Sequence, residues 1–441
     1  MEKNALWLFV RRLSLESAIF YLLLLFLPTQ LGKHFWPSFS YVLGIRSDFL
    51  SPIVYLTDVF VCLLFLFWAI AIAKGFISIK PWRISIRLKY VFPFVFLLFE
   101  LLFWPGNKFL ELYGLVKLGE MVWLAWYVSK NLARKYNFVN VVGVLSISAI
   151  IECLLAMLEF VNQHSMDGLW YWLGERHFTP QTIDIADMSL NGDLILRPYA
   201  TFPHPNVLAG YLLLISTLCL FLFTSLNKKL KYYFLFVYLL SSLVLFLSYG
   251  RSSIIGWMAV FVFFLWRQLQ NKHKKIILSI LGLTAIGIML LFTLTGNITR
   301  FVDLSWQSQA VSQRLKLLFA SLFLFYKYPW IGVGWNNFLP SLANLNSYQL
   351  NFYSLQPVHN IFVLVLAETG IVGFSVLSLF VYLTSKKIFK NLKHNPNSLL
   401  GLLLLLEIAW TGSIDHYWLT LQQGQLFLAL TMGIIWSKYT T

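Results

Sequence analysis

The chain has 441 residues, of which 59% are hydrophobic and only 12% are charged, with a net charge of +16. Soluble proteins are about 45–50% apolar, so this composition excludes an ordinary soluble domain. Repeated apolar runs of about 20 residues predict membrane-spanning helices instead. The spans leave no room for a nucleic-acid-binding domain, and we expect no nucleic-acid partner. Cys62, Cys153 and Cys219 lie singly in apolar runs, which predicts packing roles for them.

In chain order, the apolar runs predict twelve membrane spans. The first follows Arg11 and Arg12 and resembles a signal peptide, but it lacks a small-residue cleavage site, so we interpret it as an uncleaved span. The expected spans are residues 14–31, 52–73, 89–105, 109–129, 138–161, 205–226, 232–250, 252–267, 276–296, 359–384, 398–414 and 418–436.

The positions of the basic residues orient these spans. Lys3, Arg11 and Arg12 place the N-terminus in the cytoplasm, and most of the other Lys and Arg fall in the loops that are then cytoplasmic. We therefore expect a multi-pass protein of the cytoplasmic (inner) membrane with both termini in the cytoplasm. The chain is interpreted as one membrane domain, 1–441, with long extracytoplasmic loops at 162–204 and 297–358.

The second long loop contains an apolar stretch at 312–338 that is interrupted by basic residues, among them Arg314. This pattern predicts a helix lying at the membrane surface. A thirteenth span is the alternative, but it would reverse the sidedness of the lysine-rich loop at 385–395.

Polar residues gather at the external ends of four spans. Spans six, eight, ten and twelve run from outside to inside, so their helix N-termini, with unpaired N–H groups and partial positive charge, share the external face. Such termini bind anions, and arginine forks match phosphate oxygens. The polar residues in question are Arg197, His204, Asn206, Arg251, Arg314, His359, Asn360, Asp415, His416 and Gln422.

Several of these residues also have simpler interpretations. Arg197 and Arg314 would suit lipid headgroups, His204, Asn360 and Asp415 would suit helix caps, and Asn206 would suit a local backbone partner after Pro205. Glu368 lies deeper, where a carboxylate is by default a functional candidate, although an ion pair with Lys117 would satisfy it equally well.

Four blocks around these residues resemble the O-antigen ligase and O-antigen polymerase superfamily of bacterial membrane glycosyltransferases. Each block alone is short, but they occur in order and at matching topological positions. The blocks are RPYATFPHPNVLAGYL at 197–212, LSYGRSSIIG at 247–256, QRLKLLFASLFLFYKYPWIGVGWNNF at 313–338 and VHNIFVLVLAETGIVG at 358–373.

The resemblance implies an all-α, GT-C-like enzyme. It would take a glycan from an undecaprenyl diphosphate-linked donor and pass it to a glycan acceptor on the outer face of the membrane, as a ligase or a polymerase does. The family's essential arginines map onto Arg251 and Arg314 and its histidine onto His359, while Asp415 falls where the family varies.

From these positions we expect the arginines to stabilise the leaving diphosphate. His359 would act on the acceptor hydroxyl, with Asp415 as alternative base or as its orienter. The substrate-binding candidates are Arg197, His204, Asn206, Asn360, His416 and Gln422. The external face carries no Asp-x-Asp or Glu-x-x-His pair, so we expect neither a metal nor another cofactor.

Other functions remain open at this point. Transfer of the glycan to protein would use the same site. A lipid-linked oligosaccharide flippase also has about twelve spans, but transporters bind near mid-membrane at broken helices of related halves, whereas these residues share one face. A sensor or scaffold with the same fold would differ only in lacking activity.

Overall fold

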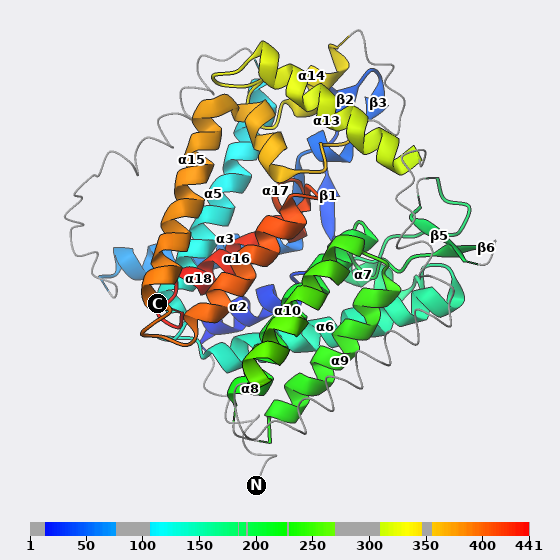
Figure 1. Ribbon diagram of the computed structural model, residues 1–441. Helices are drawn as coiled ribbons and strands as arrows, with labels where there is room; N and C mark the ends of the chain where they lie inside the picture. The colour runs from blue at the N-terminus through cyan, green and yellow to red at the C-terminus, as the bar shows by residue number, and fades with distance from the viewer. Residues whose placement is uncertain are drawn as a thin grey trace.

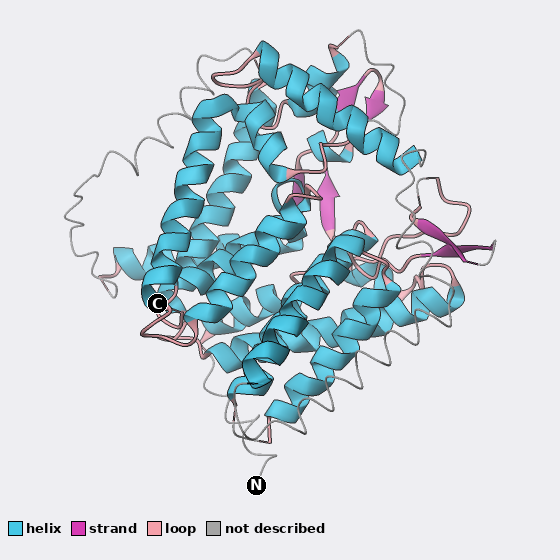
Figure 2. Cartoon of the chain, in the orientation of Figure 1, coloured by secondary structure: helices cyan, strands magenta, loops and turns pink. Residues whose placement is uncertain are grey.

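The computed structural model describes residues 14–75, 106–183, 185–190, 193–226, 229–269, 309–345 and 355–440. Within them the chain is largely helical (Figure 2). The expected spans 89–105 and 276–296 lie outside the described residues. The other ten expected spans each coincide with a helix, with shifts of a few residues at the ends.

The long helices carry the expected spans and the surface segment. They are α2 (Leu15–Leu25), α3 (Leu56–Ala73), α5 (Lys108–Asn131), α6 (Phe138–Asn162), α8 (Pro205–Ser225), α9 (Lys231–Leu247), α10 (Arg251–Leu269), α13 (Gln309–Lys327), α15 (Ile361–Asn391), α16 (Ser398–Gly412) and α18 (Gln422–Trp436). Short helices are α7 (Leu169–Leu173), α14 (Phe338–Ala343) and α17 (Tyr417–Thr420).

Among the described residues, α3, α6, α8 and α15 are long and apolar enough to cross a membrane, and α2, α9, α10 and α16 are shorter apolar helices. The apolar stretch of α8 is 94% buried, whereas that of α3 is 17% buried. Helix α8 packs against α9, α6, α10 and α16, so it forms the centre of the bundle (Figure 1). The exposed apolar surface of α3 suits contact with lipid. The protein is therefore a membrane protein, and the count of twelve spans stays a prediction.

Three small antiparallel strand pairs, which the sequence did not predict, lie in or beside the segments that are expected to be extracytoplasmic. Strand β1 (Gly32–His34) pairs with β4 (Ile53–Tyr55) in the register Gly32 with Tyr55. The other pairs are β2 (Tyr41–Val42) with β3 (Ile45–Arg46), and β5 (Asp187–Leu190) with β6 (Asp193–Leu196). Together with α13 and α14 they gather at one end and one side of the bundle (Figure 1).

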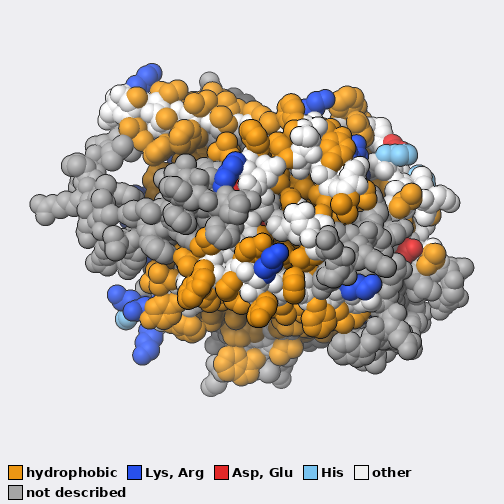
Figure 3. All heavy atoms as spheres, turned by 90° about the horizontal axis from the view of Figure 1, so that it is seen from above, with side chains coloured by type: hydrophobic (Ala, Val, Ile, Leu, Met, Phe, Trp, Pro, Cys, Tyr) orange, Lys and Arg blue, Asp and Glu red, His pale blue; other side chains and the backbone are white. Residues whose placement is uncertain are grey.

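Helix α13 occupies the segment expected at the membrane surface. Its inner face buries Leu317 and Leu324, while Phe319, Phe323 and Tyr326 on the outer face are exposed. Hydrophobic side chains cover much of the face seen in Figure 3, which is the end of the molecule that bears α13, with Lys and Arg scattered among them. This two-sided pattern suits a helix in the membrane interface, and its location there stays a prediction.

Candidate active site

A cavity of about 1040 Å³ opens among the segments that are expected to be extracytoplasmic and the helix ends next to them. Seven of the ten residues singled out from the sequence line it, although they come from four separate parts of the chain. They are His204, Asn206, Arg314, His359, Asp415, His416 and Gln422. Arg197, Arg251 and Asn360 are not among its lining residues.

Asp415 is the centre of the polar contacts in this cavity. Its Oδ1 accepts a hydrogen bond from the backbone N–H of His416 at 2.8 Å, and its Oδ2 accepts one from Asn206 Nδ2 at 3.1 Å. His359 Nδ1 lies 3.6 Å from Asp415 Oδ1, which is just beyond hydrogen-bond length. Catalytic contacts commonly tighten by this much when substrate binds.

The charges at this centre follow from burial and from the neighbouring groups. Burial by itself raises the pKa of the Asp415 carboxyl, but the nearby imidazoles, first of all that of His359, together outweigh it and hold that pKa well below its usual range. Burial, aided by His359, lowers the pKa of His416 to about 3. Burial and the Arg197 charge lower the pKa of His204 to about 3 as well. Near neutral pH the centre therefore holds the ionised carboxylate of Asp415 and the uncharged imidazoles of His204 and His416.

Two buried carboxylates of α6 shape the segment that leads to His204. Glu159 Oε2 accepts hydrogen bonds from the backbone N–H groups of Tyr199 and Ala200, both at 2.7 Å. Glu152 accepts from the N–H of Thr201 at 3.0 Å and from its hydroxyl at 2.9 Å. These bonds hold a tight turn in which Ala200 takes the left-handed conformation, with φ of 50°. The sequence analysis did not single out either glutamate.

Arg197 connects this turn to the centre of the site. Its Nε donates to the carbonyl of Ser248 at 2.7 Å, and its Nη2 donates to Asn206 Oδ1 at 2.8 Å. Asn206 in turn donates to Asp415. His204 caps α8, since its Nδ1 accepts from the Asn206 N–H at 3.1 Å. The guanidinium of Arg197 is thus directed at Asn206, which orients Asp415, and not at the cavity.

Asn360 likewise holds backbone in place. Its Oδ1 caps α15 by accepting from the N–H groups of Phe362 and Val363 at 2.9 and 3.0 Å. Its Nδ2 donates to the Ser413 carbonyl at 2.9 Å. Because Asn360 follows His359 directly, this bond ties the histidine to the loop that carries Asp415.

Another wall of the cavity is held by backbone contact between residues 330–334 and residues 368–370. Both segments contain glycine at the contact. The N–H of Gly334 donates to the carbonyl of Glu368 at 2.8 Å. A Cβ added to Gly332 would lie 2.3 Å from the carbonyl carbon of Glu368, and one added to Gly370 would lie 2.4 Å from that of Trp330. Both glycines also have positive φ, of 68° and 60°. Only glycine allows this approach of the two chains.

The pairing of Glu368 with Lys117, considered from the sequence, does not occur. Glu368 Oε1 instead accepts from the N–H of Phe338 at 3.3 Å and so helps to hold the same wall. Lys117 pairs with Asp58 on α3, at 2.6 Å. Both Glu368 and Lys117 line the cavity.

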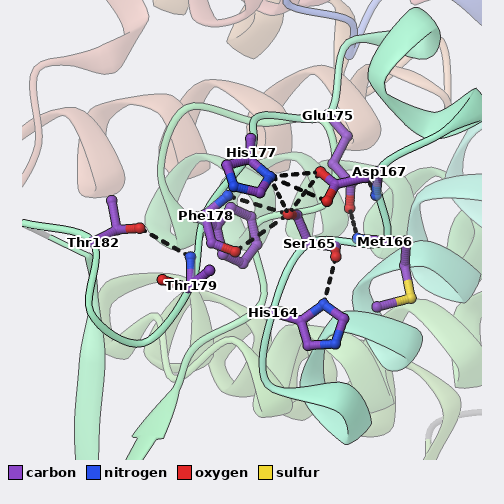
Figure 4. A network of polar contacts seen from close by, with 9 residues as sticks. All are labelled: His164, Ser165, Met166, Asp167, Glu175, His177, Phe178, Thr179 and Thr182. Carbon is purple, nitrogen blue, oxygen red and sulfur yellow. Dashed lines mark hydrogen bonds and ion pairs between the residues drawn. The ribbon is translucent and has the colours of Figure 1, made fainter.

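The segment after α6 folds into a compact wall of its own (Figure 4). The Glu175 carboxylate accepts from the N–H groups of Met166 and Asp167 at 2.7 and 2.8 Å. His177 Nδ1 lies 2.9 Å from Asp167 Oδ1 and 3.5 Å from Ser165 Oγ. One ring nitrogen thus faces both the serine and the aspartate, which does not match a proton relay of the serine-hydrolase type. The cluster holds the loop in shape.

Two arginines that the sequence analysis did not select also line the cavity, namely Arg46 on β3 and Arg176, which stands between Glu175 and His177 in the sequence. The guanidinium of Arg46 lies 4.4 Å from the ring centroid of Trp36. Arg251 begins α10 and is exposed there. Few basic residues are expected on the external side, and that scarcity was the signal that could have identified Arg46 and Arg176.

His359, Asp415 and His416 could also bind a divalent cation. Each offers one ligand atom, and these atoms lie within 4.8 Å of one another, and histidine with carboxylate is a set that zinc accepts. Both Asp415 oxygens and His416 Nδ1 already have hydrogen-bond partners within the protein. The expected independence from metal stays a prediction, which chelation tests.

The apolar helices and the large cavity lined by charged and polar side chains define a membrane protein with a candidate reaction or binding site. Residues 234–378 match the protein family described as O-antigen ligase. This match confirms the resemblance over the segment that carries Arg251, Arg314 and His359.

A curated relative matches a larger part of the chain. It is the General O-oligosaccharyltransferase of Acinetobacter baylyi (strain ATCC 33305 / BD413 / ADP1), which is 24% identical over 331 residues. The match covers 71% of this chain and 54% of the relative, so the chain spans about half the length of that protein.

Proposed function

We propose that the protein transfers a glycan from an undecaprenyl diphosphate-linked donor to a hydroxyl of a glycan acceptor, on the outer face of the cytoplasmic membrane. The observation that carries this proposal is the placement of His359 and ionised Asp415 in one cavity with Arg314. The first two groups suit proton removal from a hydroxyl, and the third suits a phosphate leaving group.

In the proposed reaction, the acceptor oxygen attacks the anomeric carbon of the donor sugar. The new carbon–oxygen bond forms as the bond to the phosphate oxygen breaks, and the hydroxyl proton moves to His359. Asp415 stabilises the imidazolium that results. Arg314 stabilises the charge that grows on the diphosphate, and each charge-assisted hydrogen bond is worth about 1.5–3 kcal/mol.

A protein acceptor is the second candidate, favoured by the name of the relative, a general O-oligosaccharyltransferase. The same two groups would deprotonate a serine or threonine hydroxyl. We favour the glycan acceptor because residues 234–378 match the O-antigen ligase family.

The test is a transfer assay with purified protein in lipid vesicles. The donor is a carrier diphosphate-linked glycan, and the acceptors are lipid A–core, a second carrier-linked repeat unit and a serine-rich peptide, each with and without chelator. The variants are His359→Ala and Arg314→Ala. Their matched controls are His394→Ala and Lys327→Ala, which alter exposed residues outside the cavity.

We expect transfer to a glycan in chelator, with a loss of about a hundredfold or more in both site variants and little change in the controls. Transfer to the peptide alone would establish the second candidate. Movement of the donor across the bilayer without transfer would replace both with a transporter. Equal activity in the site variants would show that the site is wrong.

A further inference from the structure

A second polar cluster lines the same cavity, away from Asp415. Lys117 on α5 donates from Nζ to Asp58 Oδ2 at 2.6 Å, to Gln422 Oε1 at 2.9 Å and to Glu120 Oε2 at 3.4 Å. Gln422 Nε2 also donates to Asp58. Helices α3, α5 and α18 therefore meet at one buried ammonium group, and Lys117, Gln422 and the adjoining Tyr55 and Tyr113 line the cavity.

The charge of this cluster differs from that of the rest of the cavity. Two carboxylates, Asp58 and Glu120, face the single charge of Lys117, whereas Arg46, Arg176 and Arg314 line the other parts of the wall. A diphosphate is attracted to the arginines and gains nothing from a lysine that two carboxylates already neutralise. The cluster is therefore suited to an uncharged ligand.

Aromatic rings surround the cluster. The ring centroids of Tyr55 and Tyr113 lie 5.4 and 5.9 Å from Lys117 Nζ. Trp335 lies against α5, since a Cβ added to Gly114 would be 2.5 Å from Trp335 Cδ1, and it lines the cavity as well. Rings offer flat apolar faces to the C–H groups of a sugar, while the ammonium group of Lys117 and the amide group of Gln422 are suited to hydrogen bonds with its hydroxyls.

We propose that Lys117, Gln422 and the rings of Tyr55, Tyr113 and Trp335, positioned by Asp58 behind them, form a subsite for the uncharged sugar that accepts the glycan. This inference rests on the proposed function. We favour the acceptor sugar over the donor sugar as the ligand of this subsite, because Gln422 is close in the chain to Asp415 and His416. Only the short helix α17 separates them. A sugar seated on the cluster thus lies in the same cavity as the group that would deprotonate it, while the arginines remain for the diphosphate.

The alternative interpretation is that the cluster is a purely structural ion pair that joins three helices. Measurements of binding and of kinetics distinguish the sugar subsite from the structural ion pair. Maltotriose, a matched oligosaccharide ending in glucuronic acid, and a serine-rich peptide serve as probes for wild-type protein in detergent, with ligand-observed NMR as the readout. The variants are Asp58→Asn and Trp335→Ala. For each variant, the KM for acceptor and the KM for donor are measured in the transfer assay. Glu16→Gln, which breaks the Glu16–Lys135 ion pair outside the cavity, is the matched control.

We expect maltotriose to bind in preference to the acidic oligosaccharide and the peptide. Asp58→Asn and Trp335→Ala are each expected to raise KM for a neutral acceptor about tenfold or more, with KM for donor changed less than about twofold and Glu16→Gln unchanged in both. The preserved donor KM shows that the variants remain folded.

Each other outcome overturns the inference. A fall in melting temperature with both KM values unchanged would leave only the structural ion pair. Preference for the peptide or the acidic oligosaccharide would assign the cluster to a different ligand class. If wild-type protein transfers glycan but binds no neutral sugar, the subsite fails and the proposed function stands. If it binds maltotriose yet transfers to no acceptor, the proposed function fails and so does the acceptor role.

Discussion

The two walls of the cavity are positioned by different kinds of contact. The wall of residues 197–206 is held by side-chain hydrogen bonds, because Glu159 accepts from the backbone N–H of Tyr199 and a separate chain of bonds runs from Arg197 through Asn206 to Asp415. The wall of residues 330–338 is held by backbone contact at Gly332 and Gly370. In the sequence the two motifs look alike, each a short run of unusual residues. Their tolerance of substitution differs, because a hydrogen bond can be replaced by a similar one, whereas a backbone contact leaves no room for any side chain.

The largest expected effect is at the end of the hydrogen-bonded wall. Asp415→Asn keeps the shape of the side chain but removes the charge that stabilises the imidazolium of His359, so we expect transfer to fall about a thousandfold or more. The measurement is kcat in the vesicle assay, with Asp187→Asn, an exposed aspartate on β5, as control. Activity within tenfold of wild type would remove Asp415 from the mechanism.

The second largest effect is expected at the wall of residues 330–338, which is held by backbone contact. Gly370→Ala places a Cβ 2.4 Å from the carbonyl carbon of Trp330 and forces alanine into a backbone conformation, with φ of 60° and ψ of −164°, that is essentially restricted to glycine and costs about 1–3 kcal/mol. We expect the wall to shift, with a lower melting temperature and a loss of activity of about a hundredfold. Gly143→Ala on α6 is the matched control, because nothing lies within 4 Å of the added Cβ. Equal melting temperatures for the two variants would show that the contact is dispensable.

A smaller effect is expected at Arg197, which acts through Asn206. Arg197→Lys keeps the charge but cannot bond Ser248 and Asn206 together, so we expect kcat to fall about tenfold, by analogy with lost positioning contacts, with KM for donor nearly unchanged. A direct contact with diphosphate, as the sequence suggested, would instead raise KM for donor. The ratio of the two parameters decides between these roles.

The smallest expected effect is the dependence of the unfolding free energy on pH. It arises at the histidines on the hydrogen-bonded side of the cavity. His204 and His416 have folded pKa values of about 3, below the unfolded value of about 6.5. The unfolded chain therefore binds more protons below pH 6.5, and stability falls as the pH falls. Each histidine is expected to cost about 2 kcal/mol of unfolding free energy at pH 5 relative to pH 7.

The low pKa of Asp415 acts in the same direction but only at more acid pH, because the unfolded carboxyl takes up its proton at a higher pH than the folded one. The check is the melting temperature at pH 7 and pH 5, for wild type and for His416→Gln, which removes one of the two contributions. An equal pH dependence in the variant would mean that His416 is not buried as a neutral group.

The sequence alone predicted most of the described helices and a set of candidate site residues, seven of which line one cavity. Apolar runs, turn residues and the blocks around His204, Arg314 and His359 are local properties, and they were enough to bring seven candidates to one cavity. The expectation that helix N-termini would gather at one end also follows from span length and direction, which hydropathy determines.

Only the tertiary structure decided which of those residues face the cavity. It placed Arg197 behind the wall and Arg46 on its surface, paired Lys117 with Asp58 in place of Glu368, and brought Gly332 against Gly370. These outcomes depend on how far each helix is rotated about its axis and on the depth at which it packs. Neither quantity is encoded in the apolar pattern, because lipid-facing and buried apolar side chains look the same in a membrane sequence.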